Sequence, residues 1–278
     1  MLRHALLFAA TTLLLTACAT APQTRSGYLS TYDGLKPRTD VVRAKVSEKR
    51  EDAAVQAVRR VALEPSVIAP GADLGWMTAE ERDLLLNQMD ARMCFALSRR
   101  FEVAAEPSSA DAKVRAAVTL VRPTGRAGSA LSAAAGFFIP GPIGVRTPVG
   151  LGALGAEAEM VDAASGRQLA AVTWSRQANP VGTDTPSLSR IGDALQYTGA
   201  FAGAAARAFA PPGAPRRKIE ANADPCARFG PRFRPEGFAA KFATGLYMPE
   251  LSGARDEDEE GLEPEAAPPA ASSAPAPN

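Results

Sequence analysis

Hydrophobic and polar positions alternate in the parts of the chain that we predict to be strands. In DAKVRAAVTLV, residues 111–121, valine, alanine and leucine at every second position face one way, and lysine, arginine and threonine face the other. Residues 155–177 contain two such runs joined by the turn DAASGR, in which Gly166 suits a left-handed turn. A shorter apolar run near Arg60–Ser66 is ended by Pro65. The alternation therefore predicts four strands.

Two segments show the spacing of helices that are buried on one side. In the first, Thr78 and Glu81 form a capping box, and apolar residues recur at helical spacing at Leu86, Met89, Met93, Ala96 and Leu97. We interpret this stripe as core rather than as a ligand groove. The second helix is predicted to begin at Thr185, before Pro186, and to stop at Pro211.

The order β-α-β-β-β-α predicts an α+β domain. Because the first strand–helix–strand unit favours a parallel crossover, we expect a four-stranded mixed sheet with both helices packed on one face. The other face would expose Lys113 and Arg115 on one strand and Glu157 and Glu159 on another. These opposite charges are placed to pair across the sheet.

Composition divides the chain into segments around this domain. We expect a signal peptide, a polar tether and N-terminal arm, the α+β domain, an irregular extension rich in Pro, Arg and Phe, and a disordered tail that is acidic and then Pro/Ala-rich, at residues 1–17, 18–58, 59–210, 211–251 and 252–278. Within the domain, residues 128–155 form a long apolar, Gly/Pro-rich insertion. It either folds back over the domain or provides a contact surface for a partner protein, a like subunit or the membrane.

The first eighteen residues have the features of a bacterial export signal. A basic start is followed by an apolar run from Ala5 to Leu15, which is too short to span a membrane. The sequence LTAC, ending at Cys18, resembles the lipobox of bacterial lipoproteins, in which the cysteine thiol receives a diacylglycerol and becomes the first residue. Ala19, in the place where an Asp favours the inner membrane, makes the periplasmic face of the outer membrane the expected location, with the inner membrane as the alternative.

The composition limits the chemistry that the mature chain can perform. Its one histidine, His4, lies in the signal segment, so Ser-His and Cys-His catalysis and histidine-ligated metals are excluded. A net charge of +1 gives no field that would attract nucleic acid. Cys94 and Cys226 remain, either as a disulfide or as one buried and one unpaired thiol.

Two motifs suggest chemistry that we do not assign. GLGALG, residues 150–155, has the glycine spacing of a dinucleotide-binding turn, but prolines precede it and a strand pattern follows it instead of a helix. Glu157 and Glu159 lie two apart on one strand face, as an acid–base pair of a hydrolase would. Alternating carboxylates on an exposed strand are ordinary, so no catalytic, cofactor-binding or metal-binding residue is assigned.

Several phrases of the sequence resemble a known family. The LTAC motif, SGYLSTYDGLKP, ADAKVRAAVTLVRPTG, and GAEAEMVDAASGRQLAAV with the helix that follows it are similar to the bacterial lipoprotein family called domain of unknown function 3313, over about Ser26–Phe209. The resemblance implies an envelope lipoprotein with an α+β domain and no assigned activity. Only Cys18 carries over as a functional residue.

These inferences together predict a lipid-anchored envelope protein that is not an enzyme and needs no cofactor. Its expected role is to bind or scaffold another envelope component. The alternatives are an oligomeric accessory component of an export or envelope complex, with residues 128–155 as its interface, and, third, an envelope hydrolase.

Overall fold

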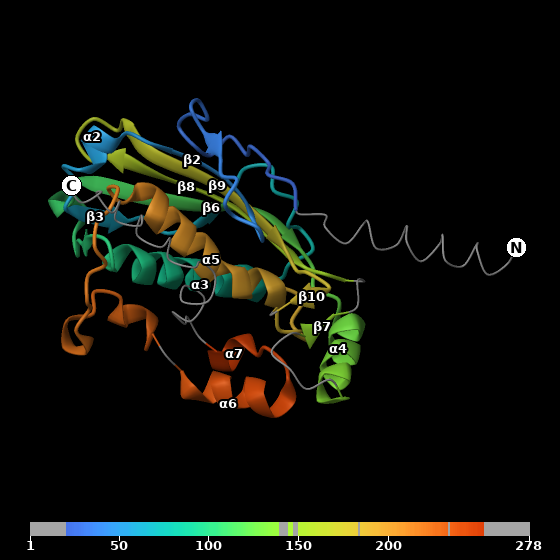
Figure 1. The fold of residues 1–278 in the computed structure, drawn as a ribbon. Coiled ribbons are helices and arrows are strands. Elements are labelled where there is room, and N and C mark those ends of the chain that lie inside the picture. The colour runs from blue at the N-terminus through green and yellow to red at the C-terminus, as the bar shows by residue number, and fades with distance from the viewer. Residues whose placement is uncertain (1–20, 139–143, 147–149, 183, 233, 253–278) are drawn as a thin grey trace, which may run out of the picture.

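The protein is built on one eight-stranded mixed sheet. The computed structural model describes residues 21–138, 144–146, 150–182, 184–232 and 234–252, without the side chains of residues 134–138, 144, 145, 181, 182, 221 and 250. The strand order is β1-β2-β9-β8-β6-β3-β5, with β4 also paired to β6 (Figure 1). The strands are β1 (Lys36–Pro37), β2 (Lys45–Arg50), β3 (Arg60–Leu63), β4 (Val67–Ile68), β5 (Glu102–Val103), β6 (Ala112–Arg122), β8 (Ala153–Asp162) and β9 (Gln168–Gln177).

The predicted α+β class is confirmed, but the predicted four-stranded sheet is too small. The four predicted strands are β3, β6, β8 and β9, and the predicted parallel pairing of β3 with β6 is confirmed. The sheet is extended on one side by β2, which pairs with β9. In the sequence KVSEKR of β2 only Val46 is buried, so an apolar alternation is absent. β1, β4 and β5 have two residues each, too few for any periodicity.

Helices α3 (Ala79–Ser98) and α5 (Gly192–Phe209) lie against each other on one face of the sheet, as predicted (Figure 1). The capping box at the start of α3 is confirmed, since Thr78 Oγ1 accepts from the Glu81 N–H and Glu81 accepts from the Thr78 N–H. The core between helices and sheet contains both methionines of the predicted stripe, Met89 and Met93, which are fully buried. The stripe is therefore core.

The predicted start of the second helix at Thr185 is wrong. The helix α5 begins at Gly192, and the residues before it form a turn that the C-terminal extension holds, because the Tyr247 N–H donates to the Pro186 carbonyl at 2.8 Å. The end of the helix at Phe209, two residues before Pro211, is as predicted. A local cap signal at Thr185 was overridden by a contact with a segment about sixty residues away along the chain.

The described part of the insertion contains a helix, α4 (Arg126–Phe138), and a short strand, β7 (Gly144–Val145), paired with β10 (Val181–Gly182). A buried ion pair ties this strand to the domain, because the Arg146 guanidinium binds the Asp193 carboxylate through both nitrogens, at 2.7 and 3.1 Å. Asp193 also accepts the Gly152 N–H at 2.8 Å. The insertion is thus fixed to the first turn of α5.

The glycines of GLGALG have structural roles in this arrangement. Gly150 has a φ of +74° and its backbone passes directly against Gly125. A Cβ at Gly152 would lie 2.8 Å from the Asp193 carboxylate oxygen, so only glycine lets Asp193 reach the backbone there. The run enters β8, with no helix after it.

The C-terminal extension is not wholly irregular. It contains the short helices α6 (Pro235–Thr244) and α7 (Pro249–Ser252), which pack on each other below the helical layer (Figure 1). A four-residue helix, α2 (Asp52–Val55), connects β2 to β3. Among the described residues, no helix has both the length and the apolar content needed to cross a membrane. Ser252, the first residue of the predicted tail, belongs to α7, and the rest of that tail, residues 253–278, lies outside the described residues.

Candidate functional site

Two carboxylates lie buried under the N-terminal segment on the face of the sheet opposite the helices. Glu157 and Glu159 on β8 are both 0% exposed. The expectation that they line an exposed strand face is therefore wrong. Residues 21–35, here called the N-terminal strap, cross this face and cover them. The predicted pairing of Glu159 with Arg115 across the sheet is confirmed.

Each carboxylate is satisfied by donors from the strap. Glu157 accepts from the Ser26 N–H at 3.3 Å, from the Ser26 hydroxyl at 2.6 Å and from the Tyr32 hydroxyl at 2.7 Å. Burial and the bond to Glu157 raise the pKa of Tyr32, which keeps this hydroxyl protonated as a donor. A buried carboxylate needs such donors because its desolvation is otherwise costly.

Glu159 is bound from both the strap and the sheet. It accepts from the Ser30 N–H at 2.9 Å, the Ser30 hydroxyl at 3.0 Å and the Gln168 amide at 2.6 Å, in addition to Arg115. Neither Glu157 nor Glu159 reaches solvent in this arrangement, so their present role is to hold the strap. We call the two glutamates with Ser26, Ser30 and Tyr32 the carboxylate latch.

The strap is fixed from the first residue that the structure describes. Ala21 is fully buried, and its carbonyl accepts from the Ser175 hydroxyl at 2.8 Å. Two positions later, the Gln23 amide donates to the Thr173 carbonyl at 3.0 Å. The chain that we predicted as a tether is therefore docked on the sheet from residue 21 onward. Cys18 and the predicted signal peptide lie outside the described residues.

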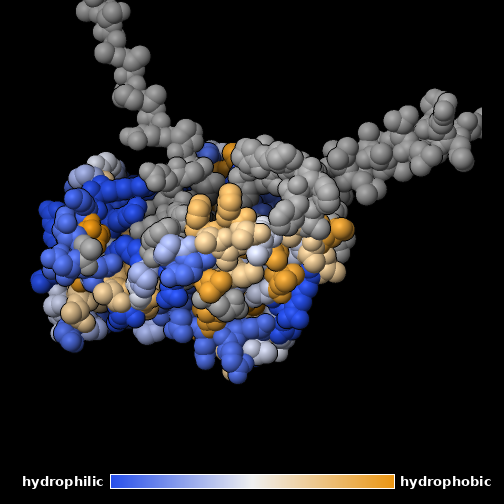
Figure 2. Space-filling view, turned by 90° about the horizontal axis from the view of Figure 1, so that it is seen from below, coloured by the Kyte–Doolittle hydropathy of each residue, from blue (hydrophilic) through white to orange (hydrophobic). Residues whose placement is uncertain are grey.

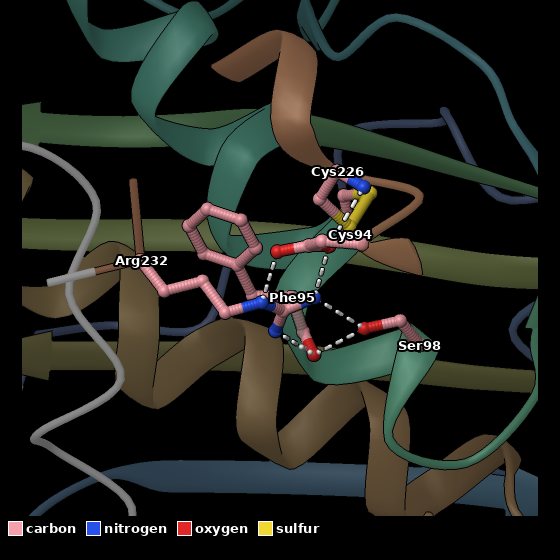
Figure 3. The surroundings of a disulfide bond; sticks show 6 residues. Cys94, Phe95, Ser98, Cys226 and Arg232 are labelled. Atoms are coloured by element: carbon pink, nitrogen blue, oxygen red, sulfur yellow. Dashed lines mark hydrogen bonds and ion pairs between the residues drawn. A yellow bond between two sulfur atoms is a disulfide. The ribbon is translucent and has the colours of Figure 1, made fainter. Parts of the chain in front are cut away.

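A disulfide attaches the C-terminal extension to α3. Cys94 and Cys226 are bonded with a Cα–Cα distance of 5.8 Å (Figure 3). Beside them, the Arg232 guanidinium lies 4.4 Å from the centre of the Phe95 ring and donates to the Ser98 hydroxyl at 3.0 Å. Of the two alternatives for the cysteines, the structure shows the bonded pair.

An ion pair next to the disulfide also stabilises the attachment of the extension to α3. Arg232 binds the Asp224 carboxylate at 2.6 and 2.7 Å, and Asp224 also accepts the Cys226 N–H at 2.9 Å. The bonds from Arg232 hold the pKa of the Asp224 carboxyl below its usual value of 3.8. The charge, the ring contact and the disulfide thus act together at one place on α3.

The attached extension forms one wall of an open groove on the helical side of the molecule. The groove has a volume of about 460 Å³, and its walls come from the start of α3, Arg126 at the start of α4, the turn before α5 and the end of the extension. Its apolar lining is Leu84, Leu188, Ile191, Leu246, Met248 and Pro249. The Ser187 hydroxyl donates to the Tyr247 carbonyl at 2.8 Å and fixes the extension to this wall.

Charged groups occupy the end of the groove at α3. Arg190 binds Glu81 at 2.7 and 3.1 Å and lies 5.3 Å from the centre of the Trp76 ring. Burial alone would raise the pKa of Glu81, but the bonds from Arg190 and the Thr78 N–H lower it below its usual value. Glu81 therefore stays ionised at neutral pH, and the groove presents one apolar and one ionic part.

Large apolar side chains are also exposed next to this groove. On α6, which packs against α7, Phe242 is 86% and Phe238 is 52% exposed. Leu188 at the groove itself is 47% exposed. Figure 2 shows apolar residues gathered at the centre of this face with polar residues around them. Exposed apolar groups in one area are typical of binding surfaces.

Sequence reasoning named Glu157 and Glu159 but missed the strap and the groove. The serines and tyrosine of SGYLSTY carry no periodicity, and their function depends on glutamates about 130 positions later. The one available signal was the alternation of two glutamates within a strand whose other residues before Asp162 are apolar, which is unusual for a solvated face. The groove joins segments that no local pattern connects.

Comparison with solved structures finds distant similarities. A PelC dodecamer from Paraburkholderia phytofirmans aligns with a TM-score of 0.34 and 12% identity over 58% of this chain and 97% of that one. A DUF4136 family protein from Bacteroides thetaiotaomicron aligns with a TM-score of 0.33 and 12% identity over 61% of this chain and 98% of that one.

No curated protein matches the sequence. A family profile does match, and it covers residues 24–205, from the N-terminal strap through β8 and β9 to the last turns of α5. The described residues within that range contain the carboxylate latch and all eight strands of the sheet, whereas the C-terminal extension lies beyond it. The chain belongs to the family described as "Protein of unknown function (DUF3313)".

Proposed function

We propose that this protein is a lipid-anchored module of the bacterial envelope that binds a partner protein through the groove on its helical side. The observation that carries the binding role is the groove itself, with its apolar lining, its ionic end and the exposed phenylalanines beside it. A protein segment with apolar side chains and a charged group is the partner that this combination fits.

The lipid anchor is supported by two features on the protein side. The sequence LTAC at residues 15–18 has the form of a lipobox, and the chain is docked on the sheet three residues later. The disulfide between Cys94 and Cys226 is consistent with an extracytoplasmic location, because such bonds persist in oxidising compartments. We propose the periplasmic face of the outer membrane as the location.

The anchor is tested by replacing the acceptor cysteine. The variant Cys18→Ser should move from the membrane fraction to the soluble fraction of the periplasm, and intact-mass measurement of the wild type should show a diacylglycerol-bearing Cys18 as the first residue. A variant that stays with the membranes, or a wild type that begins elsewhere, would contradict the proposal.

The groove is tested by site-specific crosslinking in cells. A photoreactive amino acid at Leu188, in the groove, should give one discrete adduct, and the same amino acid at Ala164, in the exposed turn between β8 and β9, should not. Leu246→Glu should abolish the adduct at position 188, whereas Ala164→Glu should leave it unchanged. The same adducts from both positions would contradict the groove as the binding site, and an adduct of twice the chain mass would identify a homo-oligomer instead.

A further inference from the structure

The end of the sheet where the chain enters the domain also carries α4. Ala21 is bonded to Ser175 near the end of β9, and the register places Ser175 beside Gly155 near the start of β8. β6 ends at this same end of the sheet, with Arg122 opposite Ala153, and α4 begins four residues later. Figure 1 shows α4 beyond the strand ends, on the side where the described chain begins.

In residues 126–133 of α4, whose side chains the structure describes, the exposed side after Arg126 is apolar and the buried side is polar. Ser129 and Ser132 are buried against the protein, at 2% and 6% exposure, while Leu131 is 62% exposed and Ala127 and Ala130 are exposed with it. A helix on the surface of a protein in water normally has the opposite arrangement. In the thirteen residues of α4, Arg126 is the one charged residue. The outer side of this described part of the helix is therefore suited to an apolar environment.

The short connection to Cys18 specifies what that environment is. Ala19 and Thr20 alone separate Cys18 from the buried Ala21, and three peptide units span at most about 11 Å. If Cys18 carries the acyl chains, this end of the sheet is held within that distance of the headgroups. Because the strap is docked on the sheet from Ala21 onward, the segment between Cys18 and the domain is too short for the domain to rotate freely relative to the membrane.

The charges at this end agree with a lipid surface. Arg122, at the end of β6, and Arg126, at the start of α4, are both exposed. Arginine side chains beside an apolar helix face are attracted to anionic headgroups while the apolar face enters the interface. Arg126 also lines the groove on the helical side, whereas Ala127, Ala130 and Leu131 do not, so a partner protein in the groove leaves the apolar side of α4 for the bilayer.

We infer that α4 is a second membrane contact, in which Ala127, Ala130 and Leu131 enter the interface of an anionic leaflet next to the lipid anchor. This inference rests on the proposed lipidation of Cys18. A single acylated residue fixes only a point, and the helix fixes the orientation of the domain. The opposite end of the sheet, with the turn around Ala164, would then point away from the membrane.

The contact is tested with the full lipidated chain in vesicles that contain phosphatidylglycerol. Because Cys18 is acylated and Cys94 is bonded to Cys226, a new cysteine is the one free thiol available for a fluorophore. A fluorophore at Leu131→Cys should be quenched by brominated lipid severalfold more than one at Ala164→Cys. Adding Ala127→Glu, at an exposed position that leaves the fold intact, should reduce the quenching at position 131.

The outcomes separate this inference from the proposal on which it rests. Equal quenching at the two positions, or none at either, in a sample whose intact mass shows acylated Cys18 would overturn the α4 contact and leave the anchor standing. A sample whose mass shows an unmodified Cys18 would overturn the anchor. Unchanged quenching with Ala127→Glu would show that the apolar side of α4 does not enter the lipid.

Discussion

At the scale of single residues, Glu157 and Glu159 determine whether the N-terminal strap stays on the sheet. Both carboxylates are fully buried, and the strap supplies hydroxyl and backbone donors to each of them. Hydrogen bonds to a charged group contribute more than neutral ones, and a buried charge without its donors is strongly destabilising. The latch therefore depends on the charge of these two side chains and not only on their shape.

Removing that charge should loosen the strap. Glu159→Gln places an amide group opposite Arg115 and the donors of Ser30, so we expect the free energy of unfolding to fall by about 2–3 kcal/mol. Urea unfolding followed by circular dichroism measures this change. Glu106→Gln, at an exposed position, is the matched control and should change stability by less than about 0.5 kcal/mol. Equal effects of the two substitutions would show that the latch does not stabilise the fold.

A second residue-scale prediction concerns the glycine run at the start of β8. Gly152→Ala would place a Cβ 2.7 Å from the Thr124 hydroxyl and 2.8 Å from Asp193, so we expect a loss of stability of about 1–3 kcal/mol. Gly75→Ala is the control, because a Cβ there meets nothing within 4 Å. If both variants unfold at the wild-type urea concentration, the close packing at Gly152 is not needed.

At the scale of elements, the sequence predicted those whose signal is local. The alternation in β6, β8 and β9 and the capping box of α3 were sufficient to place these elements. β2 was missed because it is held by its pairing with β9, and its own pattern has one buried residue. The start of α5 was misplaced because Tyr247 binds the turn at Pro186. Elements that depend on distant partners have no local pattern to read.

The disulfide also joins distant elements, because it attaches the C-terminal extension to α3, and its removal gives a testable prediction. It closes a loop of 132 residues, for which the chain-entropy treatment gives a stabilisation of up to about 5 kcal/mol. We expect the Cys94→Ser/Cys226→Ser double variant to lose about 2–5 kcal/mol of unfolding free energy. Trypsin should also cleave it faster at the exposed run Arg216–Lys218, because the extension is no longer held on α3.

Stability of the wild type under reducing conditions should match that of the double variant. A double variant as stable and as resistant to trypsin as the oxidised wild type would show that the contacts of Arg232 alone hold the extension. In that case the disulfide would not be required to hold the extension in place as a wall of the groove.

At the scale of the whole molecule, the sheet separates two differently built faces. The strap and the carboxylate latch cover one face, and the helices, the extension and the groove cover the other. The sequence indicated the export signal and the helical layer, but it could not indicate that residues 21–35 close the outer face. That closure would fix where the proposed lipid anchor meets the domain, and it explains why Glu157 and Glu159 on β8 can be fully buried.

The pH dependence of stability is a property of the whole molecule. The described residues contain no histidine, so we expect a flat stability between about pH 5 and 8. The backbone N–H groups of Arg60 and Arg59 lower the pKa of Asp111, and Arg232 lowers that of Asp224. A carboxyl whose folded pKa is depressed stabilises the fold above its unfolded pKa of about 3.8, and this contribution is lost as the pH falls through the folded value.

Stability should therefore decline below about pH 4. Asp90 acts in the opposite direction, because burial raises its pKa and its protonation favours the folded state. The urea concentration at the midpoint of unfolding, measured from pH 3 to 8, tests whether the loss from Asp111 and Asp224 outweighs the gain from Asp90. A step in the midpoint between about pH 5.5 and 7.5 would contradict it, since it would require a group that titrates there.

The contact between Ser26 and Glu157 spans 131 positions, and this has a consequence for biogenesis. A polypeptide exported from its amino end delivers residues 21–35 first, when their acceptors on β8 have not yet crossed the membrane. The segment next to Cys18 must remain open until the middle of the chain arrives, which is the interval in which a modifying enzyme would need access to the cysteine. If Cys18 is lipidated as proposed, closure of the latch comes late in maturation, after the lipid has been added.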